Sequence, residues 1–321
     1  MVDEVELLPP LPSEYPPITD KRHQRIRDLY LYKIFMASSS LKVNTETRFT
    51  SLVLFHRYAC HYFCDIKNKH KRRNSTDRHT HATDDGKSTI DYKNLGLIAA
   101  SCIFLGCKAE EDSRVLRDVT NVAYMCGFHI FNKDTINASG YIIEQETDPP
   151  LLDEAYWLKK STMVEKEQEV LRMLHFNVNV SHPYRAILAL VDIIQLPNDL
   201  PEEKALRESW KILNDVSLSS SVLRHPCLLI SCAVFYIVAR SIKPSFNTSK
   251  FQTTTQGDKA VIIVDESGID SDDAPSWWGC LGVVDLSHAV KDIDLAMDAL
   301  RSTVVRVSPT RPKHIVQPQD S

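Results

Sequence analysis

The sequence predicts an all-α protein, and three observations lead to this fold class. Only nine glycines occur among 321 residues, which is few for a chain rich in tight hairpins. Apolar residues recur every three or four positions in most segments, a spacing that is typical of amphipathic helices. The order of helical segments in the first half also returns in the second half, so we expect two helical domains of similar plan.

The first half contains five segments with helical periodicity. The segment 95–111 has small and apolar side chains on every face, which indicates a helix surrounded by protein, and it ends in Lys108, Glu110 and Glu111. Thr19 or Asp20 is suited to cap the start of the first helix. The expected helices run from Asp20 through at least Ile34 and over about 45–63, 95–111, 115–125 and 151–176.

The second half follows the same order after His182-Pro183. Its most apolar segment, Ile230–Arg240, aligns with Ile98–Lys108 so that apolar residues match apolar ones and Lys108 matches Arg240. We expect helices over 184–196, 202–219, 226–241 and 287–305, with Ile293, Leu295, Met297 and Leu300 of the last helix in the core.

Composition changes divide the chain into two domains with two insertions. We expect a disordered tail over 1–19, an N-terminal domain over 20–181 with a basic insertion at 65–90, a C-terminal domain over 182–308 with a polar, acidic insertion at 243–274, and a tail over 309–321. A long loop is uncommon inside a compact domain, so the first insertion should project into solvent. A short run in the second insertion, Val261–Val264, is a candidate strand. The first insertion also carries a candidate nuclear localisation signal, made of Lys67, Lys69, Lys71, Arg72 and Arg73.

Charge and hydropathy exclude several classes of protein. A net charge of −4 and a pI near 6.3 give no global basic field for nucleic-acid binding. No apolar run approaches the roughly 20 residues that cross a bilayer, and the acidic, proline-rich start does not resemble a signal peptide. We therefore expect reduced cysteines and a nuclear or cytoplasmic location, with the basic segment favouring the nucleus.

Motifs for catalysis, metal binding or cofactor binding do not occur in the sequence. The eight cysteines and twelve histidines contain no Cys-x-x-Cys or His-Glu-x-x-His spacing. Phosphate-binding loops, nucleophile elbows and dinucleotide fingerprints are absent as well. Adjacent carboxylates such as Glu110 and Glu111 diverge on a helix instead of meeting at one substrate. The sequence therefore predicts no catalytic residue, no metal and no cofactor, and favours a protein whose surface binds a partner.

Two stretches resemble the paired cyclin boxes of the cyclin family. One is L-I-A-A-S-C-I-F-L-G-C-K-A-E-E, which ends at Glu111, and the other is E-K-E-Q-E-V-L-R-M-L-H-F, in which Glu167 is followed by Leu171 and Phe176 four and nine residues later. The resemblance covers about 20–306 apart from the insertions. Finer details, namely L-R-D-V-T-N-V, L-L-D-E-A-Y-W-L-K-K and P-S-W-W, resemble the cyclin Q group, also called cyclin M.

This resemblance implies two tandem five-helix cyclin boxes and a non-catalytic regulatory subunit. Such a subunit binds and activates a cyclin-dependent serine/threonine kinase as a 1:1 heterodimer, in cell-cycle or transcription control. By resemblance, Lys108 and Glu167 engage the kinase and hold its mobile N-lobe helix in the active position. The remaining kinase-binding residues implied in this way are Ala109, Glu111, Leu171 and Phe176.

One departure from the family pattern and three alternatives accompany this interpretation. The first-helix docking patch of cell-cycle cyclins, M-R-A-I-L, reads Ile26-Arg27-Asp28-Leu29-Tyr30 here, so we do not expect substrate recruitment through it.

A transcription-type cyclin related to cyclins K, L or T is one alternative. A DNA-binding factor of the TFIIB type shares the fold and is the second. The third is a metal-dependent hydrolase that uses the histidine-rich insertion.

Overall fold

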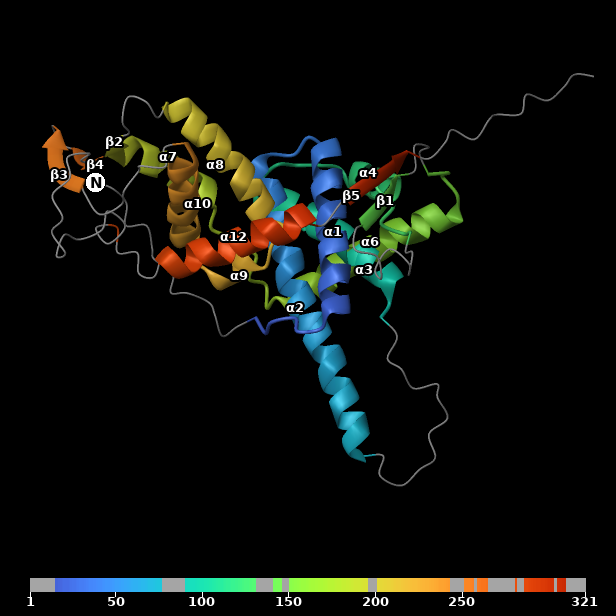
Figure 1. The fold of residues 1–321 in the computed structure, drawn as a ribbon. Helices are drawn as coiled ribbons and strands as arrows, with labels where there is room; N and C mark the ends of the chain where they lie inside the picture. The colour runs from blue at the N-terminus through green and yellow to red at the C-terminus, as the bar shows by residue number, and fades with distance from the viewer. Residues whose placement is uncertain are drawn as a thin grey trace, which may run out of the picture. The chain divides into compact units, whose positions relative to one another are not determined.

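A computed structural model shows a chain of two compact units (Figure 1). The N-terminal unit comprises residues 16–179 and 303–321, and the C-terminal unit comprises residues 1–15 and 180–302. The structure describes residues 15–76, 90–130, 141–145, 150–195, 201–242, 251–256, 259–264, 281, 286–302 and 305–309.

Five described helices build the N-terminal unit around a central helix, α3. α3 packs against α1, α2, α4 and α6, and every residue from Ile98 to Ile103 is buried. This confirms the prediction of a helix surrounded by protein. The helices are α1 (Lys21–Ser40), α2 (Thr45–Thr76), α3 (Tyr92–Ala109), α4 (Leu116–Met125) and α6 (Glu154–Met173), and one parallel strand pair joins β1 (Tyr141–Gln145) to β5 (Val305–Pro309).

Aspartates fix the start of three of these helices. Asp20, Asp91 and Asp153 precede α1, α3 and α6, and each side chain accepts a hydrogen bond from a backbone N–H two or three residues later. An N-cap carboxylate satisfies a free backbone donor and also interacts favourably with the positive end of the helix dipole. The predicted cap at Asp20 is thereby confirmed.

Small residues let α3 approach its neighbours closely. A Cβ atom added at Gly96 would overlap the backbone carbonyl of Phe128, and one added at Gly106 would overlap the Ser51 side chain on α2. Gly96 therefore requires glycine because the facing atom belongs to the backbone, whereas a side chain at Gly106 would force the Ser51 side chain to move.

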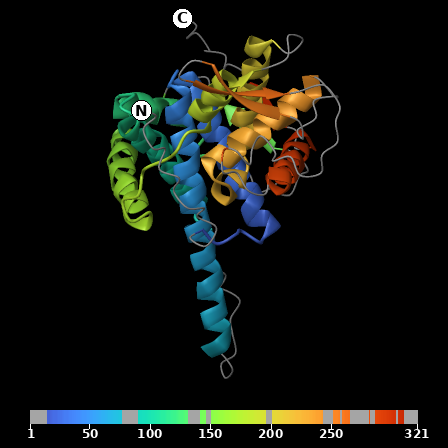
Figure 2. The same cartoon turned by 90° about the vertical axis from the view of Figure 1, so that its left-hand side faces the viewer.

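Helix α2 is longer than the sequence predicts. We expected an end near Phe63 and a loop over 65–90, but the helix continues to Thr76, while residues 77–89 lie outside the described part of the chain. In both views the C-terminal part of α2 extends beyond the other helices of its unit (Figures 1 and 2). Lysine and arginine have good helix propensity, so a helix can continue there although the apolar periodicity has ended.

The C-terminal unit also consists of helices around an apolar central helix. Here α10 packs against α7, α8 and α12, and α10 is buried at Ile230 to Phe235. Its helices are α7 (Pro183–Ile193), α8 (Glu202–Val216), the short α9 (Ser221–Arg224), α10 (Cys227–Ile242) and α12 (Leu286–Ser302). Its three-stranded sheet has the order β2-β4-β3, formed by β2 (Ile194–Gln195), β3 (Phe251–Gln256) and β4 (Lys259–Val264).

The sheet gives part of the second insertion a regular structure. β4 pairs in parallel with β2, where Ile194 faces Ile262, and antiparallel with β3, where Thr254 faces Val261. The candidate strand at 261–264 is thus part of β4. The predicted all-α class is confirmed, since the described strands are short additions to the helices.

One side chain that we expected in a helix core is exposed. Leu295 on α12 is 68% exposed, whereas Ile293 and Met297 are buried at 0% and 8%. Residues four apart share a helix face, and a residue two positions from either points elsewhere. Val164 on α6 is 40% exposed as well, although the preceding Met163 is buried. None of the described helices is long and apolar enough to cross a membrane.

Candidate partner-binding site

The structure brings Lys108 and Glu167 together at a junction between α3 and α6. Lys108 lies in the last turn of α3, and Glu167 lies in the middle of α6. Lys108 Nζ donates a hydrogen bond to Glu167 Oε1 at 2.6 Å. The Lys108 side chain is 50% exposed, and the Glu167 side chain is 10% exposed. The buried carboxylate therefore anchors a cation that remains accessible to a partner.

Two further interactions favour the position of Lys108. A cation at the C-terminus of a helix interacts favourably with the negative end of the helix dipole. Phe104 precedes Lys108 by one turn, and Lys108 Nζ lies 4.3 Å from the centre of its ring, within the range of a cation–π contact. An ammonium group has three N–H donors, so Lys108 can donate to partner carbonyls while it stays bonded to Glu167.

The residues after Lys108 form a turn that ends α3, and a hydrogen bond from α2 holds this turn in place. Glu110 is the C-cap of α3, and its carboxylate accepts a hydrogen bond from Thr50 Oγ1 on α2 at 2.6 Å. Glu111 follows with a left-handed backbone at φ 55°, and its side chain is exposed. Ala109 is exposed too. Glu110 thus holds the turn, whereas Ala109 and Glu111 face away from the unit.

The end of α6 presents an aromatic side chain to solvent. His175 and Phe176 both have left-handed backbones, with φ at 50° and 61°, and Phe176 N donates to Leu171 O at 2.8 Å. This left-handed termination satisfies free carbonyls of the last helical turn. Phe176 is 68% exposed and Leu171 is half-buried. The exposed Phe176 ring adds apolar surface at the end of α6, next to Leu171.

Sequence reasoning missed two members of this surface. Val164 precedes Glu167 by three residues and Leu171 by seven, so the three residues share one face of α6. Phe104 lies one helical turn before Lys108 on α3 and contacts its ammonium group. The spacing from Glu167 was the signal for Val164. We call Phe104, Lys108, Val164, Glu167, Leu171 and Phe176 the α3–α6 face.

The proposed nuclear-signal residues lie elsewhere on the unit. Lys67 to Arg73 belong to the part of α2 that extends beyond the other helices (Figure 1). The structure therefore places them on a helical backbone instead of a loop. Their role as a localisation signal stays a prediction.

The segment at the position of the docking patch presents little apolar surface. Ile26 and Leu29 are buried at 0% and 3%. Burial raises the pKa of the Asp28 carboxyl, while the neighbouring Arg27 guanidinium lowers it through an ion pair at 2.6 Å. This charged pair and the buried leucine and isoleucine support the expectation that the segment does not recruit substrates.

A cavity of about 450 Å³ lies between α3, α4 and α6, and its polar side chains already have structural roles. Asp153 caps α6, Lys159 Nζ lies 5.1 Å from the centre of the Tyr124 ring, and the His129 ring stacks on the Tyr124 ring with their centres 4.2 Å apart. Among the residues that line this cavity, we find no pair of groups placed for acid–base chemistry. The cavity therefore does not indicate an enzyme.

The fold is that of a helical protein, and its α3–α6 face offers accessible side chains to a partner. A model of the cyclin N-terminal domain matches residues 3–179, which is more than half of the chain. The chain belongs to the cyclin family. Members of this family are non-catalytic kinase regulators, which confirms the expectation that this chain is not an enzyme.

Several curated relatives are cyclins L. Cyclin L homolog cyl-1 of Caenorhabditis elegans is 28% identical over 222 residues, which cover 65% of this chain and 45% of the relative. Cyclin-L1 of Danio rerio is 27% identical over 49% of this chain and 28% of its own length. Human Cyclin-L1 is 28% identical, with 49% and 27% covered. The matched part is thus less than half of each relative.

Two solved structures share the fold. The CAK complex from Chaetomium thermophilum bound to ATP-gamma-S contains a similar chain, with a TM-score of 0.50, 12% identity, and coverage of 89% of this chain and 66% of that one. A chain of the yeast RNA Pol II CTD kinase CTDK-1 complex has a TM-score of 0.50 and 13% identity, and 90% of this chain and 75% of that one are covered. At such low identity, these likenesses show the fold alone.

Proposed function

We propose that this cyclin binds and activates a cyclin-dependent serine/threonine kinase as a 1:1 heterodimer. The observation that carries this proposal is the Lys108–Glu167 pair, because it combines an anchored, accessible cation with the exposed apolar side chains of Val164 and Phe176. The two similar chains described above belong to the CAK complex bound to ATP-gamma-S and to the RNA Pol II CTD kinase CTDK-1 complex, which supports the choice of partner.

The action on the kinase is conformational. A cyclin that binds the active arrangement of a kinase more tightly than the inactive one shifts the kinase population toward activity. We propose that Lys108 donates to main-chain carbonyls near the mobile N-lobe helix of the kinase, while Glu167, Ala109, Glu111, Leu171 and Phe176 complete the contact. The ordered Lys108–Glu167 pair lowers the entropy cost of this contact, because the lysine is already oriented before binding.

Transcription control is the function that the relatives favour. The curated relatives described above are cyclins L, which supports the transcription-type alternative more than a cell-cycle role. The assignment to the cyclin Q group stays a prediction from the motifs. We further propose that residues 20–181 and 182–308 are the two cyclin boxes and that the basic segment of α2 directs the protein to the nucleus.

A pull-down from native extract tests the proposal. The tagged chain should retain one cyclin-dependent kinase at equal stoichiometry, identified by mass spectrometry, and the eluate should phosphorylate serine or threonine. A peptide of the RNA polymerase II C-terminal domain should be a better substrate than a basic peptide if the transcription-type assignment is correct. An eluate without kinase activity would contradict activation, and a preference for the basic peptide would contradict only the transcription assignment.

A further inference from the structure

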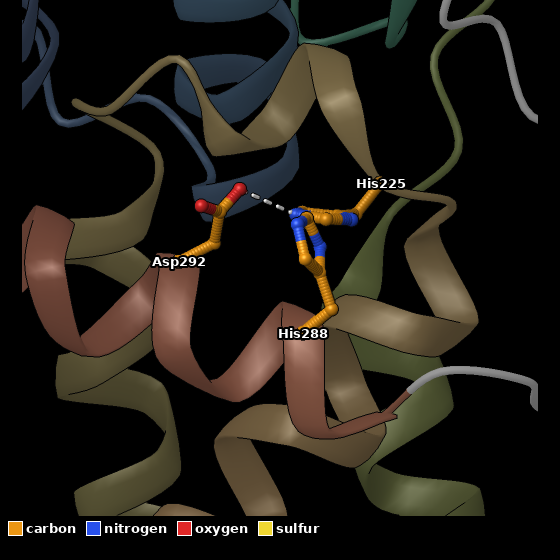
Figure 3. A group of neighbouring side chains, drawn as sticks. All are labelled: His225, His288 and Asp292. Atoms are coloured by element: carbon orange, nitrogen blue, oxygen red, sulfur yellow. Dashed lines mark hydrogen bonds and ion pairs between the residues drawn. The ribbon is translucent and has the colours of Figure 1, made fainter.

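Three side chains of the C-terminal unit form a compact cluster that the proposed kinase contact does not use. His225 lies in the turn between α9 and α10, and His288 and Asp292 lie four residues apart on α12. Their potential ligand atoms all lie within 4.8 Å of one another. Figure 3 shows a nitrogen of His288 beside the His225 nitrogen that faces Asp292. We propose that these residues form a zinc-binding site.

The chemistry of the three groups favours zinc over harder cations. Two imidazole nitrogens and one carboxylate oxygen are ligands that Zn²⁺ accepts, whereas Mg²⁺ and Ca²⁺ require mainly oxygen ligands. Three protein ligands leave one position of a tetrahedral ion for water. His288 and Asp292 are one helical turn apart, so both side chains point from the same face of α12.

The geometry needs only small side-chain adjustments. Ligand atoms around a tetrahedral ion with bonds of about 2.0–2.1 Å lie about 3.3 Å apart. His225 Nε2 and Asp292 Oδ2 are 2.9 Å apart in this structure, where they form a hydrogen bond. These two groups would separate slightly, and the exposed His288 would rotate inward from a separation of at most 4.8 Å.

The buried members of the cluster are held in place before an ion binds. The side chains of His225 and Asp292 are 8% and 17% exposed. His225 also donates its backbone N–H to Ser221 O at 3.2 Å, which fixes the turn before α10. Partial burial limits competition from water and leaves the exposed His288 as the ligand that completes the site.

Arg224 is the main electrostatic opponent of an ion. Its Nη1 lies 3.2 Å from Asp292 Oδ2, and a guanidinium so close to the site repels Zn²⁺. The Arg224 side chain is 52% exposed, so it can turn into solvent when zinc binds. The ordinary alternative is that Asp292 only pairs with Arg224 and His225. The zinc interpretation predicts that removing the arginine tightens zinc binding, whereas the ion-pair interpretation predicts no change in zinc binding.

Zinc at this position would join the last helix of the unit to the turn that precedes α10. Anything that binds only the folded state stabilises it. At a zinc concentration one hundred times the Kd, the folding equilibrium constant should rise about one hundredfold. The ion would therefore act on stability and leave the α3–α6 face unchanged, which makes this inference independent of kinase binding.

The test uses the full chain, stripped with a chelator and titrated with ZnCl₂ in a calorimeter and in thermal unfolding. Wild type should bind one more equivalent of zinc than His288→Ala, whose affinity at this site should fall at least about tenfold. Arg224→Ala should bind zinc more tightly than wild type. Lys291→Ala changes a neighbouring exposed residue of α12 and should behave like wild type.

Comparison of the variants distinguishes zinc bound at this site from any zinc bound by cysteines or other histidines. If wild type and His288→Ala take up the same amount of zinc and their unfolding temperatures rise equally, the proposal is wrong. Zinc binding by Arg224→Ala that is no tighter than that of wild type would also overturn it, because the ion-pair interpretation predicts this result.

Discussion

Reversal of the charge at Lys108 is the sharpest test of the α3–α6 face. Lys108→Glu places a second carboxylate next to Glu167, whose oxygen lies 2.6 Å from the present ammonium. Two unit charges about 4 Å apart interact with about 4 kcal/mol near a protein surface and about 1 kcal/mol in bulk water. Lys108 is 50% exposed, so the free energy of unfolding should fall by only about 1–2 kcal/mol.

The loss of kinase affinity should be larger than the loss of stability. Removing one partner of a desolvated, hydrogen-bonded contact costs roughly 2–5 kcal/mol in binding. This corresponds to an increase of the Kd by a factor between about thirty and several thousand. Calorimetry with the kinase recovered in the pull-down measures the affinity, and circular dichroism shows whether the variant is folded.

Lys211→Glu is a matched control for this experiment. Lys211 is 62% exposed and pairs with Glu208 at 2.7 Å, but both residues belong to α8 of the C-terminal unit. The control makes the same charge change beside a glutamate and should bind the kinase like wild type. A folded Lys108→Glu variant with unchanged affinity would refute our assignment of Lys108.

Three further predictions concern the packing of the N-terminal unit. Gly96→Ala should lower the free energy of unfolding by about 1–3 kcal/mol because the new methyl group meets the Phe128 carbonyl; an unchanged urea midpoint would contradict the close approach. Lys33→Met should lower the free energy of unfolding by about 1–3 kcal/mol, since the buried ammonium donates to two backbone carbonyls after α4. Urea unfolding measures this loss, with Lys211→Met, which changes an exposed lysine, as the control. Burial raises the pKa of the Cys107 thiol from 9.0 to about 11, so the folded form keeps its proton while the unfolded form ionises, and stability should be lost as pH rises from about 9 to 11. Alkylation near pH 8 should label the partly exposed Cys64 before Cys107; equal labelling of the two in the folded protein would argue against burial.

The sequence was sufficient to predict most helices because their signals are local. Asp20 caps the first helix as expected, and the continuous apolar character of 98–103 matches a buried helix. Helix α2 shows where periodicity becomes insufficient, because a helix outside the core needs no apolar face. Leu295 shows a second limit, since an apolar side chain at one position does not determine which face of the helix is buried.

The sites were predictable to different degrees. The family resemblance suggested both Lys108 and Glu167, but their hydrogen bond depends on how α3 and α6 pack, which neither segment encodes alone. The cluster of His225, His288 and Asp292 was not predicted at all. The four-residue spacing on α12 was a signal, yet His225 lies far away in sequence and approaches only through tertiary packing.

The left-handed turn after α6 has a consequence for handling the protein. Two consecutive residues that are not glycine, His175 and Phe176, adopt positive φ angles, which cost about 1–3 kcal/mol each. This backbone keeps the Phe176 ring in water just beyond the end of α6, and Trp157 and Leu158 near the start of α6 are 55% and 66% exposed. The isolated cyclin should therefore self-associate at high concentration, and co-expression with its kinase should increase the yield of monodisperse material.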